Sequence, residues 1–512
     1  MENKEKPTKD FYKDDISKIA KNAGISGFGE IFGNIINYTS NVLVTRTIGP
    51  SSFGIYVLAS NILSIVSIFS FAGLDTGLLR FVALYHGKGD QARLKGVILG
   101  GTMIGGAVSF VLFFLFFFTS DFISTRFFAN PNLSLALRIL LISLPFTTLI
   151  ILWLGVIQGF QLIKYRVYVE RFFQPISRLL FLIILFLLGM KLLGLLFATV
   201  LSAITGFLIA FWYLRKHFLS FNKTLSPLYE NRILLKFSIP IIFVRFFSFV
   251  IRSTDILMLG HFMTSYQVGI YGAVDRVLPL ILLPHQSLNI IFSPMISELY
   301  GKKDFLKLET LFKLENKWAI SLSLPVSLML IIFAHPIMNI FGTAFSQGVP
   351  VLILKNVANL TWVFVGSTGL MLMMTGHQHI SLANTTVTAI TNIILNYLLI
   401  PKYGIIGAAV ATTISLVAIN IVELTEIYYL FGFHPFRWDI LKPISAGIFS
   451  SLIILAILRF DFIKLHQNNI LLLGALIILF LTLYLLSLIL LGLSDEDKWM
   501  VKLIQKRLGI ER

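Results

Sequence analysis

The sequence predicts an all-α polytopic membrane protein with about fourteen transmembrane helices, arranged as two pseudo-symmetric six-helix lobes plus two extra C-terminal helices. Three observations support this fold class: the composition, the spacing of the apolar runs and an internal repeat. Of the 512 residues, 56% are hydrophobic and 13% are charged, and the mean hydropathy is +0.84. Soluble domains carry roughly 25% charged residues. The sequence has no cysteine, which excludes disulfides, thiol catalysis and cysteine-ligated zinc.

The apolar runs are each long enough to cross a bilayer, because about 20 apolar residues span its hydrocarbon core. Fourteen of them follow one another, with centres near residues 35, 66, 107, 146, 180, 204, 248, 283, 328, 362, 391, 417, 450 and 481. The connections are short, so none of them is expected to form a separate soluble domain.

Lys and Arg are distributed unevenly between the connections on the two sides of the membrane. Seven segments on one side, the two termini included, carry 27 of them, whereas the connections on the other side carry four. Positively charged loops stay in the cytoplasm, so both termini are predicted to be cytoplasmic in a multi-pass protein of the cell membrane. The net charge of +17 then reflects membrane topology, and no nucleic-acid partner is expected.

Four short stretches recur in the same order, 213 to 217 residues later. GIY at 54–56 returns at 269–271, YHGKGD at 85–90 as YGKKD at 300–304, GFQ at 159–161 as GHQ at 376–378, and GLLFATVLS at 194–202 as GAAVATTIS at 407–415. Each repeat holds six spans, and an even number makes the repeats parallel, related by an axis along the membrane normal. Two such lobes would enclose a cavity that opens alternately to either side.

The repeat sets the predicted domains. They are a cytoplasmic interfacial segment at 1–21, an N-lobe of helices 1–6 at 22–230, a C-lobe of helices 7–12 at 231–440, helices 13–14 at 441–492, and a cytoplasmic amphipathic tail at 493–512. The first and last segments have apolar residues at helical spacing, which favours helices that lie along the cytoplasmic membrane interface.

Residues 43–90, LVTRTIGPSSFGIYVLASNILSIVSIFSFAGLDTGLLRFVALYHGKGD, resemble the beginning of the Wzx-type polysaccharide exporters. These are the oligosaccharide-lipid (O-antigen) flippases of the multidrug/oligosaccharidyl-lipid/polysaccharide superfamily. They have a Gly-Pro turn after the first span and a Gly-Leu-x-x-Gly/Ala-x-x-Arg pattern that ends the second, here Gly73, Leu74, Gly77 and Arg80. The resemblance implies two six-helix lobes, a V-shaped cavity, and export of a polyprenyl-linked saccharide to the outer face.

Polar side chains form a stripe along the first span and another along the seventh. At about 100° per residue, each set occupies one helix face: Glu30, Asn34, Asn37 and Asn41 in span 1, and Arg245, Ser248, Arg252 and Asp255 in span 7. The repeat aligns the two faces, but the second is cationic. Ionisable groups inside a membrane usually face protein or water, so both faces are expected to line the cavity.

An asymmetric cavity of this kind suits an anionic lipid-linked sugar, because guanidinium pairs with phosphate bidentately. The predicted substrate-binding residues are Arg245, Arg252, Arg276, Asn34, Asn37, Asn61, Arg80, Arg46 and Lys355. Gating or ion coupling is predicted for Glu30, Asp255, Asp275 and Glu423. The alternative is that Arg252 with Asp255, or Glu30 with Arg245, form ion pairs that lock the lobes.

No cofactor or metal is expected, apart from a coupling ion, Na+ or H+, as an option. Asp255 with Asn392 and Asn396 is a candidate cation site. His377 and His379 lack a third ligand and are interpreted as a polar cytoplasmic turn.

The leading hypothesis is an alternating-access flippase that moves a polyprenyl-(di)phosphate-linked oligosaccharide to the outer leaflet for cell-surface glycan assembly. It would work as a monomer beside glycan-assembly enzymes. The alternatives are a small-molecule multidrug or cation antiporter of the same superfamily, which usually has twelve spans, and a membrane glycan polymerase or glycosyltransferase. Such an enzyme needs acidic or His residues on a substantial outer loop, whereas the longest outer loop, 119–133, offers only Asp121 and Arg126. No GxxxxGK[ST] motif for ATP occurs.

Overall fold

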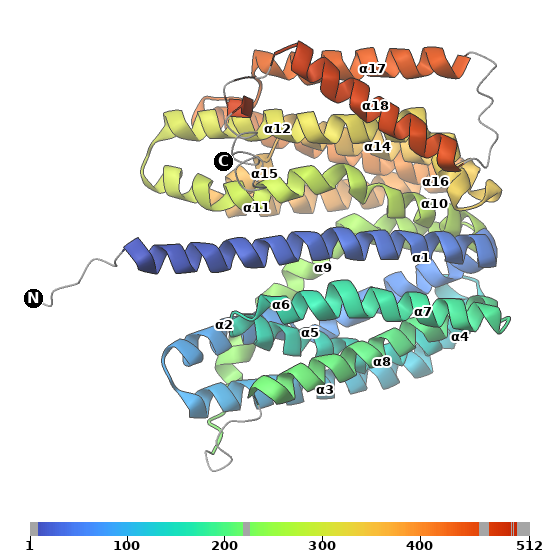
Figure 1. Ribbon diagram of the computed structural model, residues 1–512. Coiled ribbons are helices and arrows are strands. Elements are labelled where there is room, and N and C mark those ends of the chain that lie inside the picture. Colours follow the sequence, from blue (N-terminus) through green and yellow to red (C-terminus); the bar gives the residue numbers. More distant parts are fainter. Residues whose placement is uncertain (1–8, 219–225, 460–469, 493, 495, 499–512) are drawn as a thin grey trace, which may run out of the picture. The chain divides into compact units, whose positions relative to one another are not determined.

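A computed structural model describes residues 9–218, 226–459, 470–492, 494 and 496–498 (Figure 1). These residues form helices and short connections, with no strand in the described part of the chain. Every predicted span centre falls inside a helix. The predicted all-α polytopic membrane fold is therefore confirmed.

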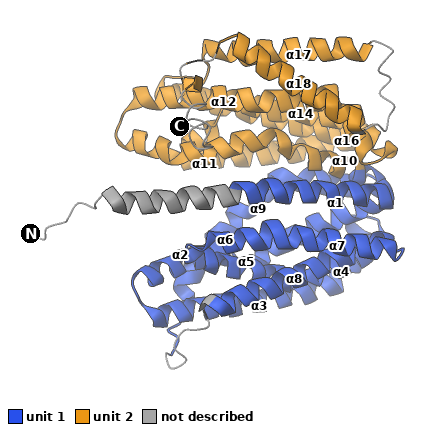
Figure 2. Cartoon of the chain, viewed as in Figure 1, with its two compact units in different colours: residues 1–269 blue, residues 270–512 orange. Residues whose placement is uncertain are grey.

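The chain divides into two compact units, residues 1–269 and 270–512 (Figure 2). In unit 1, α5 packs against α2, α3 and α8, and α9 packs against α1 and α2. The core of this unit includes Leu74, Leu78 and Trp153. Its helices are α1 (Lys9–Phe71), α2 (Leu74–Gly87), α3 (Gln91–Phe122), α4 (Pro131–Leu141), α5 (Ser143–Gly159), α6 (Ile163–Val167), α7 (Gln174–Leu187), α8 (Lys191–Phe218) and α9 (Asn231–Phe262).

Unit 2 begins inside α10 (Ser265–Val277). In it, α12 packs against α11, α14 and α17, and α14 packs against α16. Phe312, Ile320 and Met371 lie in its core. The other helices are α11 (Pro279–Gly301), α12 (Phe305–Ile332), α13 (Ala334–Ile340), α14 (Val349–Val365), α15 (Thr368–Met374), α16 (Gln378–Phe431), α17 (Leu441–Arg459) and α18 (Ile470–Leu490).

The unit boundary differs from the lobe boundary that the repeat predicts. The repeat begins its second copy at residue 231, whereas the compact units divide between residues 269 and 270. The difference is α9, which belongs to the second repeat by sequence and packs in unit 1. The lobe boundaries, which are defined by the repeat and not by packing, stay a prediction.

Two helices are too long to be single spans. Helix α1 has 63 residues and leaves the helical conformation at Gly49, and α16 has 54 residues and does so at Gly404. At about 1.5 Å per residue, each would be roughly 80–95 Å long if straight, almost three times the hydrocarbon core. Each therefore joins two predicted spans. Within the described residues, nine helical stretches are long and apolar enough to cross a membrane, or up to eleven if two bent pairs count as spans. The number fourteen stays a prediction.

The internal repeat recurs in the turns of the structure. Asp90 accepts a hydrogen bond from the backbone N–H of Arg93 at the start of α3, at 3.1 Å, and Asp304 accepts one from that of Lys307 at the start of α12, at 3.2 Å. The residue before each aspartate is left-handed: φ is 70° at Gly89 and 58° at Lys303. The repeated YHGKGD and YGKKD stretches thus build the same helix end and the same N-cap twice.

The GFQ and GHQ stretches correspond in a different register from the one the letters suggest. The sequence pairs Gly159 with Gly376, but the left-handed residues are Gln161 and Gly376, with φ of 63° and 85°. Backbone conformation, rather than residue identity, aligns these turns. The offset becomes 215, which also separates the left-handed Gly189 and Gly404.

The glycines of the two GIY stretches are Gly54 in α1 and Gly269 in α10. Each lies against the backbone just before the other stretch. A Cβ on Gly54 would lie 1.7 Å from the carbonyl oxygen of Ser265, and a Cβ on Gly269 would lie 2.0 Å from that of Pro50. Pro50 and Ser265 are themselves 215 residues apart, so the contact is reciprocal, as in an isologous two-fold interface. The repeated glycine is explained by this crossing, where only a residue without a side chain fits.

The two chain ends lie outside the repeat. Helix α1 begins at Lys9 and continues without a break to Gly49. The interfacial position predicted for residues 1–21 stays a prediction. Most of the predicted tail at 493–512 lies outside the described residues.

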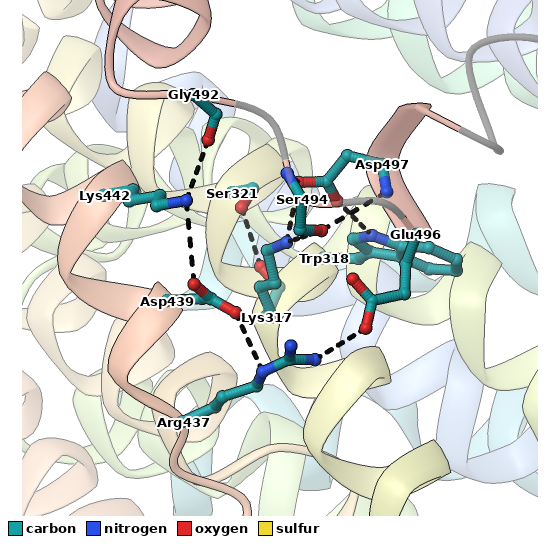
Figure 3. Close-up of polar contacts among 10 residues, drawn as sticks. All are labelled: Lys317, Trp318, Ser321, Arg437, Asp439, Lys442, Gly492, Ser494, Glu496 and Asp497. Atoms are coloured by element: carbon teal, nitrogen blue, oxygen red, sulfur yellow. Dashed lines mark hydrogen bonds and ion pairs between the residues drawn. The ribbon is translucent and has the colours of Figure 1, made fainter.

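The described part of the tail is held to unit 2 by a polar cluster (Figure 3). Lys317 of α12 donates to Ser494 and Asp497 at 2.7 and 2.6 Å, and the indole of Trp318 donates to Asp497 at 3.0 Å. Arg437, between α16 and α17, bonds Glu496 at 2.9 Å. The hydrogen bond from Arg437 is the main reason why the pKa of Glu496 falls to about 2.

Candidate functional site

Arg245 of α9 is bound by a carboxylate that the sequence stripe did not contain. Its Nη1 and Nη2 donate to the two carboxylate oxygens of Asp75 at 2.9 and 2.7 Å, and Nη2 also donates to Thr76 Oγ1 at 3.0 Å. This bidentate geometry is the strong form of an arginine ion pair. The Arg245 guanidinium therefore donates three hydrogen bonds to side chains of α2.

The Gly-Leu-x-x-Gly pattern explains why Asp75 reaches α9. Gly73 is left-handed, and a Cβ there would lie 2.2 Å from the carbonyl oxygen of Ser238 in α9. A Cβ on Gly77 would lie 2.4 Å from the hydroxyl of the same serine. Without side chains at these positions, α2 approaches α9 closely enough for the carboxylate to meet the guanidinium.

The proposed ion pair between Glu30 and Arg245 is wrong. Glu30 pairs instead with Arg171, whose Nη2 lies 2.8 Å from the carboxylate. Arg171 comes from the π-helical segment Tyr168–Phe173, which packs on α1, while α2 supplies the acid for Arg245.

Arg252 differs from Arg245 in its surroundings. Its side chain is exposed on an apolar helix, and it has no hydrogen bond or ion pair in the described part of the chain. The alternative Arg252–Asp255 pair is therefore not formed; Asp255 is buried, and its Oδ1 accepts the N–H of Ile256 at 3.0 Å. Arg252 lies seven residues after Arg245, hence on the same face of α9.

Two other arginines of unit 1 that were predicted to bind substrate also lie at the surface. Arg80 of α2 is exposed, and its guanidinium lies over the ring of Phe237 in α9, 4.4 Å from the centroid. A cation over an aromatic face is attracted by the ring quadrupole, which anchors Arg80 beside α9. Arg46 is exposed near the kink of α1. Substrate contact for either residue stays a prediction.

The polar asparagines of α1 are only partly accessible. Asn34, Asn37 and Asn61 are half-buried, and Asn61 donates to the carbonyl of Val57 at 2.9 Å. Asn41 is buried, and its Oδ1 has no hydrogen-bond partner in the described residues. Their proposed contacts with the sugar remain predictions.

In unit 2, Lys355 of α14 is paired with Asp275 of α10. The two groups are 2.5 Å apart, and the Lys355 ammonium also lies 4.2 Å from the ring centroid of Tyr271. Arg276, the next residue, is exposed. The predicted binding residue Lys355 and the predicted gating residue Asp275 are thus joined in one interaction.

Glu423 of α16 is buried, and Thr368 Oγ1 donates to it at 2.8 Å. Asn392 and Asn396 of the same helix are buried and hydrogen-bonded to each other at 2.9 Å. These asparagines belong to unit 2 and Asp255 belongs to unit 1, so the cation site proposed from the three residues stays a prediction.

Sequence reasoning missed several ionisable residues that the structure brings together. Asp75 and Arg171 bind the predicted Arg245 and Glu30. His285 and Glu315 form a fully buried pair in unit 2. Asp75 lies between the two glycines of the pattern that carries the family resemblance, but nothing in that pattern points to Arg245.

Charged and polar groups on apolar helices, in a fold of this kind, define a polytopic membrane transporter scaffold. The model of the polysaccharide biosynthesis protein family matches residues 19–300, and the MatE model matches residues 240–398. The chain belongs to the polysaccharide biosynthesis protein family, within the superfamily that the resemblance indicated.

Curated relatives match parts of the chain. The probable low-salt glycan biosynthesis flippase Agl15 of Haloferax volcanii is 28% identical over 208 residues, which are 40% of this chain and 43% of that protein. The capsular polysaccharide biosynthesis protein CapF of Staphylococcus aureus is 25% identical over 45% of this chain and 58% of its own length. The chain thus spans about half the length of these relatives. The uncharacterized membrane protein MJ1068 of Methanocaldococcus jannaschii is 24% identical over 81% of this chain and 85% of its own.

Solved structures share the fold. The lipid II flippase MurJ in an inward closed conformation has a TM-score of 0.70 and 16% identity, covering 90% of this chain and 97% of MurJ. An inward-facing multidrug resistance MATE family transporter has a TM-score of 0.69 and 16% identity, covering 78% of this chain and 94% of its own. The fold is therefore that of membrane transporters and not that of a membrane enzyme.

Proposed function

We propose that this protein is an alternating-access flippase that moves a polyprenyl-(di)phosphate-linked oligosaccharide from the cytoplasmic to the outer leaflet. Family membership over residues 19–300 and the similarity to glycan flippases support the substrate class. The product would enter cell-surface glycan assembly. The protein would act as a monomer beside glycan-assembly enzymes, in the cell membrane, with both termini in the cytoplasm.

The exposed, unpartnered Arg252 is the observation that supports a phosphate-binding role. An arginine in an apolar helix is costly, and Arg245 on the same face is already neutralised by Asp75. Arg252 has no such partner in the described chain. Its guanidinium is therefore available for a ligand, and a phosphate is the anion that it pairs with bidentately. We therefore assign the phosphate contact to Arg252 alone. Arg245, which was predicted to share it, has a structural role.

The test is glycan export by Arg252 variants in cells that lack the native gene. Loss of one charge-assisted hydrogen-bonding group costs about 1.5–3 kcal/mol, so Arg252→Ala should lower surface glycan about tenfold to a hundredfold. Arg252→Lys should restore part of it, because the ammonium keeps the charge but lacks the planar fork. Surface glycan is measured by lectin binding and normalised to the amount of protein in the membrane.

The matched control is Arg126→Ala, which removes another exposed arginine of unit 1 outside the stripe. It should leave export unchanged. Normal export by well-expressed Arg252→Ala would contradict the phosphate role, and loss of export in the control would show that the assay does not resolve individual arginines.

A second candidate function is export of a small cationic or amphiphilic drug. The MatE match over residues 240–398 and the MATE transporter fold favour it. A deletion strain that becomes drug-sensitive while it keeps normal surface glycan would support this function over the flippase.

A further inference from the structure

A histidine and a glutamate are buried together between two helices of unit 2. His285 of α11 has no exposed surface, and Glu315 of α12 is 2% exposed. The imidazole Nδ1 lies 3.4 Å from Glu315 Oε1. The substrate-binding residues proposed above do not include this pair, and neither residue has a role in the proposed phosphate contact.

The pair lacks the hydrogen bonds that buried polar groups normally have. Both ring nitrogens of His285 and both carboxylate oxygens of Glu315 are without a hydrogen-bond partner in the described part of the chain. Ser367, in the break between α14 and α15, lies beside the carboxylate, but no bond of normal geometry joins them, and its hydroxyl is directed to Asn289. A pair left unsatisfied on both sides is costly unless something occupies it.

The two lysines beside Glu315 on α12 cannot neutralise it, because each is bound to another carboxylate: Lys317 to Asp497 and Lys313 to Glu309. The indole of Trp362 from α14 lies edge-on to the His285 ring, at 5.2 Å between centroids. Of the other ionisable groups on α11, on α12 and on the elements packed against them, Lys355 pairs with Asp275, Lys442 with Asp439, Lys307 with Asp304 and Glu298 with Lys302, and His335 is hydrogen-bonded to Asn339; Arg459, at the end of α17, is exposed.

We propose that His285 and Glu315 form a proton-binding site in unit 2. Without a proton on the pair, Glu315 is an uncompensated buried anion. One proton, held on the imidazole or on the carboxyl, makes the pair neutral overall. A second proton would leave a buried positive charge. One proton per pair is therefore the favoured occupancy while α11 and α12 stay packed.

The site gives the transporter a means of coupling to the proton gradient, and this step rests on the proposed flippase function. Deprotonation would leave the Glu315 carboxylate charged and buried. Hydration would stabilise this charge, and water would reach the carboxylate if α11 and α12 moved apart. Proton binding and helix packing are thus linked, since each changes the free energy of the other. The ligand is the proton itself, and its two acceptors are contributed by helices that are adjacent in sequence.

The first experiment measures proton binding by purified protein, without any glycan. Trp362 is the reporter, because the fluorescence of an indole changes when the charge on the groups beside it changes. The signal is the difference between wild type and Trp362→Phe as the pH changes between about 4 and 8, a range that includes the ordinary pKa values of a carboxyl and an imidazole. A pH-dependent difference is expected in the wild type and should disappear in His285→Gln and in Glu315→Gln.

The control variant is His335→Gln, which removes a histidine of the same unit that is bound to Asn339. It should keep the full titration. Size-exclusion profiles and thermal unfolding identify any variant that fails to fold; in that case Glu315→Asp, which keeps the carboxyl, replaces Glu315→Gln and should shift the titration. A wild-type signal that is absent, or that persists in His285→Gln, would overturn the site.

The second experiment tests coupling in cells by collapsing the pH gradient with nigericin. Delivery of newly labelled glycan, normalised to the cytoplasmic lipid-linked pool, should fall severalfold in the wild type. Glu315→Gln should be slow and insensitive to nigericin. Equal nigericin sensitivity in both proteins would overturn the coupling role. If the wild type delivers no glycan under any condition, the flippase function fails, while the fluorescence titration still decides the proton site.

Discussion

Arginine side chains on the apolar helices of unit 1 are stabilised in three different ways. Arg245 is bound by the Asp75 carboxylate, Arg80 lies over an aromatic ring, and Arg252 is exposed and has no partner among the residues that the structure describes. A charge within a membrane is energetically unfavourable. Protein groups stabilise the charges of Arg245 and Arg80, whereas the charge of Arg252 can be stabilised by water or by a ligand. The functional proposal is therefore centred on Arg252.

The Asp75–Arg245 pair should stabilise unit 1 measurably. The two side chains are 16% and 33% exposed, and loss of either should cost about 1.5–3 kcal/mol, since the other is left charged on an apolar helix. Asp75→Asn and Arg245→Gln should each lower the thermal unfolding midpoint of the purified protein. The double variant should lose less than the sum of the two. Additive losses would show that the groups do not interact.

The partner of Arg245 could not be found from local sequence patterns. Asp75 lies 170 positions earlier in the chain, and a helical stripe relates only residues within a few turns of each other. The stripe placed Arg245 and Arg252 on one face of α9, but it contained no information on the close approach of α2, which depends on Gly73 and Gly77 packing against Ser238.

At the scale of helices and turns, the repeat is carried by the backbone more faithfully than by the residues. Gly89 and Lys303 share a left-handed conformation although they differ in type, and so do Gln161 and Gly376. A non-glycine residue in this region is uncommon. The sequence could therefore predict that a repeat exists, but it gave the wrong register where the left-handed position is not conserved as glycine in both copies.

The reciprocal Gly54–Gly269 crossing should not tolerate a methyl group. An added Cβ would lie 1.7 and 2.0 Å from backbone carbonyl oxygens, which cannot move aside as a flexible side chain can. Gly54→Ala and Gly269→Ala should each cost about 1–3 kcal/mol of stability. Gly474→Ala in α18 is the control, because nothing lies within 4 Å of its added Cβ, and it should be neutral or stabilising by up to about 1 kcal/mol. Unfolding midpoints of the three variants decide between these outcomes.

The polar cluster around the described tail should weaken in acid. The hydrogen bond from Arg437 lowers the pKa of Glu496 to about 2, from an ordinary value of 4.5. A lowered pKa in the folded state contributes stability above the ordinary value, and this contribution is lost as the pH falls toward 2. Burial acts to raise the pKa of Asp497, but its bonds to Lys317 and Trp318 lower it overall, so both carboxylates change stability in the same direction.

The measurement compares wild type with Arg437→Gln in thermal unfolding between pH 7 and about pH 2. Because Arg437 and Glu496 are more than one third exposed, the pair contributes only about 0.5–1 kcal/mol. The wild type should have the higher midpoint at neutral pH, and the difference should vanish toward pH 2. A difference that is constant with pH would contradict the ion pair.

At the scale of the whole molecule, the sequence predicted the positions of the apolar helices well, because hydropathy depends on composition and not on tertiary contacts. The family resemblance implied a Gly-Pro turn after the first span, and α1 breaks there, at Gly49. The break of α16 at Gly404 had no such signal, since Gly404 resembles the many glycines tolerated inside helices. Packing also assigns α9 to unit 1 although its sequence belongs to the second repeat. That assignment depends on long-range contacts such as Arg245 with Asp75, which periodicity does not contain.

The distribution of basic residues makes a prediction about membrane orientation that the absence of cysteine allows to be tested directly. With 27 Lys and Arg on one side and four on the other, the turn at 301–304 should face the cytoplasm and residue 132 should face outward. Both Asn132 and Lys302 are exposed, so a cysteine at either position is accessible from its own side. Lys302 is chosen over Lys303 because Lys303 is left-handed. In intact cells, an impermeant thiol reagent should label Asn132→Cys and not Lys302→Cys, and permeabilised cells should label both. The opposite pattern would place the termini outside, and the basic connections would then need another explanation.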